Sequence, residues 1–195
     1  MIDYLRTTLS SAASMEPVTI VEVKDHLRID RNLDEEDTLL EDYITTAREF
    51  AEGYTGRKFI TQTWKYYLDE FPSENYIEMP YAPLISSAST ALTFTYKSCS
   101  GLTNSMSTSD YLIDTDTTPG RINLAYGASW PGSTLSTTNP ITITFLCGYG
   151  SNAASTPMSI RTWIMSCVGY MYENREADVG DFPVGTLRRY RVGWI

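Results

Sequence analysis

The stretch AREFAEGYTGRKFITQTW, residues 47–64, contains the change from helix to strand that decides how this chain folds. Its first half has the spacing of an amphipathic helix, and Gly56 suits the left-handed conformation that follows a helix C-terminus. Arg57 and Lys58 come next, where positive charge meets the negative end of the helix dipole. Phe59 opens the run FITQTWKYYL, whose aromatic and β-branched residues are typical of strands. Since almost no linker separates the two elements, we expect them to be held rigidly together.

An earlier helix is predicted from its N-terminal signal. Thr19 and Glu22 have the spacing of a capping box, in which each residue satisfies a backbone amide of the other. Val23 and Leu27 follow on one helical face. We therefore expect a helix over about 19–30, in which the Thr19 cap contributes about 1 kcal/mol.

Two further helices are predicted over about 34–55 and 157–175. The first begins with acidic residues, which are favourable in an N-terminal turn, and the second has Thr156 as a candidate N-cap before Pro157. The core stripe expected for the former contains Leu40, Ile44, Ala47, Ala51 and Tyr54. The stripe expected for the latter contains Ile160, Trp163, Ile164, Cys167, Val168 and Met171.

The middle of the chain, about 59–147, is expected to be β. Short apolar or alternating segments are separated there by Pro, Gly, Ser and Asn. The segments are TWKYYL, NYIEM, ALTFTY, DYLID, GRINL and ITITFLC. The polar stretch 97–109 is expected to form a protruding loop, where partner contacts often lie. The predicted fold class is α+β: a three-helix bundle with an antiparallel β-sheet region inserted between helices two and three, plus an extended C-terminal tail.

Composition limits the classes of function. The net charge of −9 disfavours DNA binding through the phosphate backbone, which needs clustered Lys and Arg. The apolar runs are too short to cross a bilayer, and the N-terminus has neither the basic start nor the apolar run of a signal peptide. Three widely spaced cysteines indicate reduced thiols rather than a disulfide scaffold or zinc cluster.

Candidate chemical sites are weak. His26 is the one histidine and has no nucleophile motif beside it. The acidic residues of 34–42 lack the pattern of a calcium loop and are explained by a helix start. The group Asp110, Asp114 and Asp116 is interpreted as strand-end and turn residues. We therefore predict no catalytic residue, no metal site and no cofactor.

The C-terminal tail, residues 180–195, mixes arginines with aromatic and aliphatic side chains. A free end with so much apolar surface is unfavourable, and chain ends fray unless something holds them. Docking onto a partner or a neighbouring subunit would explain the composition, and packing back onto the same domain is the open alternative. With docking, a chain ending at Gly185 is expected to fold but not to dock.

Several of these segments together resemble the head–tail connector (adaptor, or head-completion) proteins of long-tailed bacteriophages. The resemblance rests on the helix ending YTGR followed by ITQTW, and on four further segments in consistent order. These are VTIVEVKDHLRID (18–30), DYLIDTDTTPGRI (110–122), FLCGYG (145–150) and the helix ending YENRE (172–176). Residues 1–15 do not match the pattern, and the similarity over 180–195 is loose.

This resemblance implies a structural protein of the virion neck, at the head–tail junction, assembled in the host cytoplasm. Copies would form a ring, commonly dodecameric, beneath the portal protein. The ring would extend the DNA channel and meet a stopper or tail-completion protein, with no membrane partner. The chain is then divided into an N-terminal extension (1–16), one connector domain (17–179) and a docking tail (180–195).

Two surfaces are expected in such a ring. Acidic residues on the channel wall would let DNA pass without specific binding, since no counterions are released there. The candidate lining consists of Glu35, Glu36, Asp37, Glu41 and Asp42. Aromatic and arginine side chains are the usual interface anchors, so the portal or neighbour contact is assigned to Leu187, Arg188, Arg189, Tyr190, Arg191 and Trp194.

Two other functions stay open at this point. A tail-completion or stopper protein would lie one ring further from the capsid. A soluble enzyme or small-ligand protein would need a cleft with convergent titratable groups, for which the sequence offers little.

Overall fold

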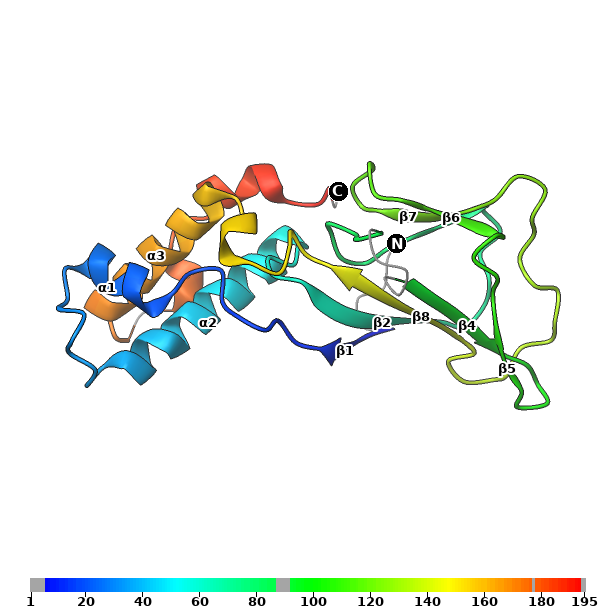
Figure 1. Cartoon of the computed structure of the whole chain (residues 1–195), viewed down its shortest axis with the longest axis horizontal. Helices are drawn as coiled ribbons and strands as arrows, with labels where there is room; N and C mark the ends of the chain where they lie inside the picture. Colours follow the sequence, from blue (N-terminus) through cyan, green and yellow to red (C-terminus); the bar gives the residue numbers. More distant parts are fainter. Residues whose placement is uncertain (1–5, 87–91, 177, 194–195) are drawn as a thin grey trace. The chain divides into compact units, whose positions relative to one another are not determined.

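The computed structural model describes residues 6–86, 92–176 and 178–193. The chain divides into two compact units. The sheet unit contains the described residues of Met1–Ala12 and Thr61–Gly148, and the helical unit contains those of Ala13–Ile60 and Tyr149–Ile195. The predicted α+β class and the antiparallel sheets are confirmed (Figure 1). The connector domain expected over 17–179 spans parts of both units.

The helical unit is built on α1 (Ile20–Leu27), α2 (Asp37–Thr55) and α3 (Met158–Glu173). Three short 3-10 helices, η2 (Ala153–Ser155), η3 (Val179–Asp181) and η4 (Gly185–Tyr190), belong to the same unit. Figure 1 shows α2 and α3 side by side, and residues of all three α-helices share one buried core. The core stripes predicted for the second and third helices are confirmed, except that Tyr54 is only half-buried.

The helix ends follow the local signals in two cases. The Thr19 hydroxyl accepts from the Glu22 N–H at 3.3 Å, and the Glu22 carboxylate accepts from the Thr19 N–H at 2.9 Å, so the capping box is confirmed. Gly56 ends α2 with φ at 68°, in the left-handed region that favours glycine.

Two expected boundaries and one expected cap are wrong. Helix α1 ends at Leu27 because the next residue, Arg28, adopts a left-handed conformation with φ at 59°. Helix α2 begins at Asp37 and not near 34, since the Asp37 N–H bonds the Asp34 carbonyl in a turn. Thr156 does not cap α3, because its hydroxyl donates to the Phe59 carbonyl at 3.4 Å.

The sheet unit contains two antiparallel sheets. The larger has the order β1 (Thr7–Ser11), β2 (Gln62–Leu68), β8 (Ile141–Cys147), β4 (Leu92–Lys97) and β5 (Thr103–Ser105). The smaller has the order β3 (Tyr76–Glu78), β7 (Arg121–Leu124) and β6 (Tyr111–Asp114). All six predicted strand segments are found, with Ala91 of ALTFTY outside the described residues.

Two strands were not predicted. β1 lies in the N-terminal extension and pairs with β2, and β5 lies in the stretch 97–109 that was expected to be a loop. The alternation predicted for ITITFLC is confirmed: Ile141, Ile143, Phe145 and Cys147 are completely buried. That face of β8 forms the core of the sheet unit with residues from neighbouring strands.

Candidate docking surfaces

The segment after α3 packs onto its own helical unit. Leu187 in η4 is completely buried in the core of the α-helices, and Val192 is 1% exposed. The Val192 N–H donates to the Thr55 carbonyl at 2.8 Å, and Arg57 Nε donates to the Tyr190 carbonyl at 2.5 Å. Packing onto the same domain, the alternative left open above, is therefore what these residues do. Because Leu187 and Val192 are buried, we expect a chain ending at Gly185 to be destabilised, and its folding stays a prediction to be measured.

The residues assigned to docking have different positions. Leu187 faces the core, and Tyr190 is half-buried with its hydroxyl 2.7 Å from the Ser159 Oγ. Arg188, Arg189 and Arg191 are exposed, and we call these three the arginine segment. Trp194 lies outside the described residues. Docking itself stays a prediction.

The arginine segment has no carboxylate partner among the described residues. Arg189 donates to the Ser159 Oγ, and its guanidinium carbon lies 4.9 Å from the Tyr190 ring centroid. Arg191 lies 5.5 Å from the Tyr54 ring centroid. Other cations do form ion pairs with carboxylates, namely Arg6, Lys24, Arg31, Arg48, Lys58, Arg121, Arg161 and Arg175. An acidic chain thus exposes a small positive surface that no carboxylate among the described residues pairs with.

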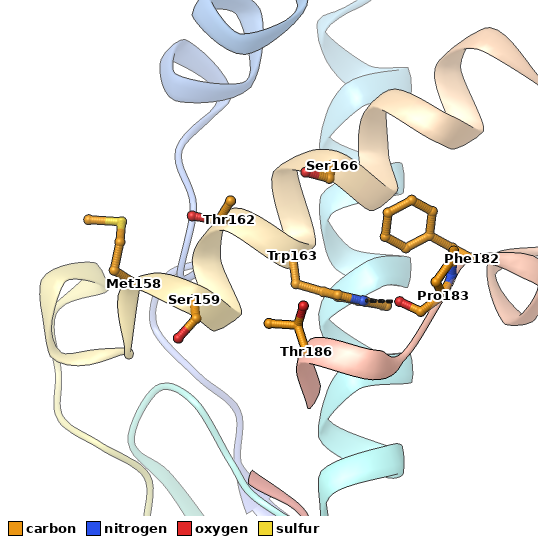
Figure 2. A pocket seen from close by; sticks show the side chains of 8 residues that line it. All are labelled: Met158, Ser159, Thr162, Trp163, Ser166, Phe182, Pro183 and Thr186. Carbon is orange, nitrogen blue, oxygen red and sulfur yellow. Dashed lines mark hydrogen bonds between the residues drawn. The ribbon is translucent and has the colours of Figure 1, made fainter. Parts of the chain in front are cut away.

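An open groove of about 600 Å³ lies beside α3 (Figure 2). We call it the α3 groove. Arg189 of the arginine segment donates to Ser159, which belongs to the lining of this groove. Its lining comes from α3 and from the segment after it, and consists of Met158, Ser159, Thr162, Trp163, Ser166, Phe182, Pro183 and Thr186. Trp163 Nε1 donates to the Pro183 carbonyl at 2.8 Å, and the Trp163 and Phe182 rings pack edge to face at 5.5 Å. Hydroxyl groups and apolar side chains therefore surround one hollow, with Met158 65% exposed.

The sequence prediction missed this groove. Trp163 was assigned to the core, which is correct, since only 4% of it is exposed. The available signal was the helical spacing of Ser159, Thr162 and Ser166, which marks a small, polar face of α3. The second wall could not be predicted, because it depends on how Phe182 and Pro183 return along the helix.

The acidic residues at the start of α2 fall into two groups. Glu36 accepts from the Tyr172 hydroxyl at 2.5 Å and from Arg175 at 2.7 Å, and the Tyr172 hydrogen bond, with Arg175, lowers the pKa of Glu36. Asp37 forms a 2.5 Å ion pair with Lys24. These two carboxylates are therefore compensated within the chain.

The other three candidate lining residues face solvent. Glu35, Glu41 and Asp42 are exposed and form no ion pair among the residues that the structure describes. They are the members of the acidic group that no described cation neutralises. The lining role itself stays a prediction.

The described residues assemble no catalytic constellation. His26 is exposed on α1, and burial raises the pKa of the Cys167 thiol to about 11, so this thiol stays protonated at neutral pH. No group of three or more His, Cys, Asp or Glu in the described ranges could hold a metal ion.

Asp114 accepts from the N–H groups of Asp116 and Thr117, which confirms its interpretation as a turn residue. Within the described part of the chain, no helix has the length and apolar character needed to span a membrane.

Comparison with known proteins supports the resemblance noted in the sequence. Residues 17–106 match the model of the family described as Phage gp6-like head-tail connector protein. The match covers α1, α2 and the strands β2 to β5. No curated protein sequence matches the chain.

Solved structures show the same fold over nearly the whole chain. A chain in the neck of an empty gene transfer agent particle, computed with C6 symmetry, is 21% identical with a TM-score of 0.79, covering 97% of this chain and 96% of its own. A chain in the virion of a native gene transfer agent particle is 20% identical, with a TM-score of 0.79. The match covers 97% of the present chain and 96% of that chain. A chain in the neck of a native gene transfer agent particle, computed with C12 symmetry, is 19% identical, with a TM-score of 0.75. The match covers 96% of the present chain and 97% of that chain.

Proposed function

Since residues 17–106 match the model of the Phage gp6-like head-tail connector family, we propose that this chain is a structural connector of the neck of a tailed-phage-like particle, and not an enzyme. In this proposal, copies form a ring beneath the portal protein that extends the DNA channel and joins capsid to tail. The observation that carries the proposal is the family match, supported by a fold shared over 97% of the chain with a neck protein of a gene transfer agent.

The ring is proposed to contain twelve copies. Neck structures with this fold have been computed with C6 and with C12 symmetry, and twelve copies suit both. A closed ring needs a head-to-tail interface in which one patch binds a different patch on the next copy. In the proposed arrangement α1, α2 and α3 form a three-helix bundle, with the sheets inserted between α2 and α3.

The C-terminal tail is proposed to contact the portal. Residues 17–179 form the connector body in this proposal, and within 180–195 the exposed Arg188 and Arg191 lie at the contact with Tyr190 and Trp194. Because Arg188 and Arg191 are exposed and lack carboxylate partners among the described residues, they suit acidic groups on another protein. Leu187 has a different role: buried in its own unit, it fixes the segment that presents these arginines.

The acidic group at the start of α2 is proposed to line the channel, with a stopper or tail-completion protein at its far end. Glu35, Glu41 and Asp42 would supply negative charge directly, while Glu36 and Asp37 are compensated by Arg175 and Lys24. Like charges repel the DNA backbone, so a wall of this kind favours passage over adhesion.

Native mass spectrometry of the full chain, alone and mixed with the portal protein of the same particle, tests the proposal. The expected result is a complex of twelve copies on the portal. Arg188→Glu with Arg191→Glu should reduce portal binding without unfolding the chain, and Lys65→Glu with Lys97→Glu in the sheet unit is the matched control. A chain that never associates with itself or with the portal would contradict the proposal.

A further inference from the structure

The connection between α1 and α2, residues 28–36, is held by several side-chain contacts, and we call it the α1–α2 loop. Its main anchor is Lys24, a lysine only 3% exposed. The Lys24 ammonium donates to the Leu33 carbonyl at 2.5 Å and to the Arg31 carbonyl at 3.4 Å. It also pairs with the Asp37 carboxylate at 2.5 Å. A buried cation is unfavourable unless it is paired and hydrogen-bonded, and here these partners are two loop carbonyls and the start of α2.

Further contacts fix the loop on both sides of Leu33. Asp30 Oδ1 accepts from the Asn32 N–H at 2.9 Å, and Arg31 forms two hydrogen bonds with Asp25 at 2.7 and 2.6 Å. Glu36 is held by Tyr172 and Arg175, as described above. All of these contacts lie within one copy of the chain, so they hold the loop without a partner.

This fixed loop presents an apolar side chain to solvent. Leu33 is 56% exposed and is followed by Asp34, which is exposed and forms no ion pair among the described residues. A rigid segment loses little conformational entropy on binding, so a fixed apolar side chain beside a free carboxylate is suited to docking.

The α3 groove has the complementary chemistry. Trp163, Phe182 and Met158 give it an apolar lining (Figure 2). Its hydroxyl groups include Ser159, to which Arg189 donates. Arg189 has no carboxylate partner among the described residues, so the groove joins apolar surface to a cation.

We propose that the α1–α2 loop of one copy docks in the α3 groove of the next copy around the ring. Leu33 enters the apolar lining, and Asp34 pairs with Arg189 of the neighbour. The two patches are different surfaces of the same unit, which is the head-to-tail relation that a closed ring requires. The inference rests on the proposed ring and identifies one of its subunit contacts.

Crosslinking between two distinguishable copies tests the contact. In a Cys99→Ser background, which removes the exposed thiol, one copy carries Leu33→Cys and a larger, tagged copy carries Met158→Cys. The two are mixed with portal protein, treated with a short bis-maleimide and separated by mass. We expect the heterologous 33–158 product to dominate. Val21→Cys, a similarly exposed apolar position at 43%, replaces Leu33→Cys as the matched control and should give little product.

A charge exchange gives a second, independent measurement. Asp34→Arg or Arg189→Asp alone should weaken self-association about tenfold or more, since each places like charges opposite one another. Combining the two in one chain should restore it. Both side chains are exposed, so neither substitution alone removes part of the core. If the single variants failed because they were misfolded, combining them would not restore self-association.

The outcomes separate the inference from the proposed function. A ring that forms without the 33–158 product, or with Leu33 linked to the portal, overturns the inference and leaves the connector role standing. The product without a ring supports the contact and contradicts the ring. Failure of both overturns both.

Discussion

The backbone N–H of Val192 donates a 2.8 Å hydrogen bond to the carbonyl of Thr55, the last residue of α2. Two parts of the chain that are far apart in sequence are thereby joined at one helix end. Because Gly56 turns the chain away at the end of α2, this carbonyl has no partner within the helix, and the Val192 N–H takes that place. The C-terminal tail therefore completes the helical unit, and its exposed arginines stand on a fixed support.

Leu187→Ala should destabilise the protein by about 2–5 kcal/mol, the range for deleting a completely buried leucine side chain. Urea unfolding followed by helical circular dichroism measures the change. Arg188→Ala, one residue on and exposed, is the control and should change stability by less than about 0.5 kcal/mol. Equal stability of the two variants would show that η4 is not part of the core.

Lys24→Met should lower the free energy of unfolding by about 2–3 kcal/mol. The substitution leaves the Asp37 carboxylate and the Leu33 carbonyl without their cationic donor, and the cost lies below that of a fully buried pair because the Asp37 side chain is 33% exposed. Lys24→Met with Asp37→Asn should recover part of the loss, which a double-mutant cycle measures. A cost below about 0.5 kcal/mol would mean that the α1–α2 loop is not held by this lysine.

Thr19→Ala should cost about 1 kcal/mol through loss of the capping box of α1. The same substitution at Thr38, an exposed threonine in the first turn of α2, provides the comparison. Thermal unfolding of both variants should show the larger loss for Thr19. The reverse order would contradict the capping argument.

The free energy of unfolding should fall as the pH drops below 4.5, the ordinary pKa of a glutamate side chain, and Glu36 contributes to this fall. The Tyr172 hydroxyl, with Arg175, lowers the pKa of Glu36 in the folded protein. A lowered folded-state pKa gives stability that is present above the unfolded value and is lost as the pH falls through the folded one. The difference in unfolding free energy between wild type and Glu36→Gln should therefore be larger at neutral pH than in acid. Tyr172→Phe, which removes the first donor, should reduce the same pH dependence, and a difference that grows in acid would have the wrong sign.

The elements whose evidence lies within a few residues were predictable from sequence. The capping box at Thr19, the left-handed Gly56 and the stripe from Ile160 to Met171 depend on local spacing, and all three are confirmed. The alternation of β8 is of the same kind, because its buried face repeats every second residue.

The missed features depend on distant partners. β1 has the uncharged sequence TTLSS without an apolar alternation, and it is a strand because β2 offers an edge to it. The hydroxyl of Thr156 could have capped α3, but it bonds the carbonyl of Phe59, which is 97 residues away in sequence. The α3 groove likewise needs Phe182 and Pro183 to pack beside α3. Local patterns carry no information on such contacts.

The central claim, that copies of this chain close a ring at the head–tail junction, is tested most directly by a cryo-EM reconstruction of the assembled particle. The account predicts density for the chain as a closed ring between portal and tail, with Glu35, Glu41 and Asp42 toward the channel. Density for the chain outside the neck would contradict the central claim. A ring with these carboxylates on its outer rim would contradict their assignment to the channel wall.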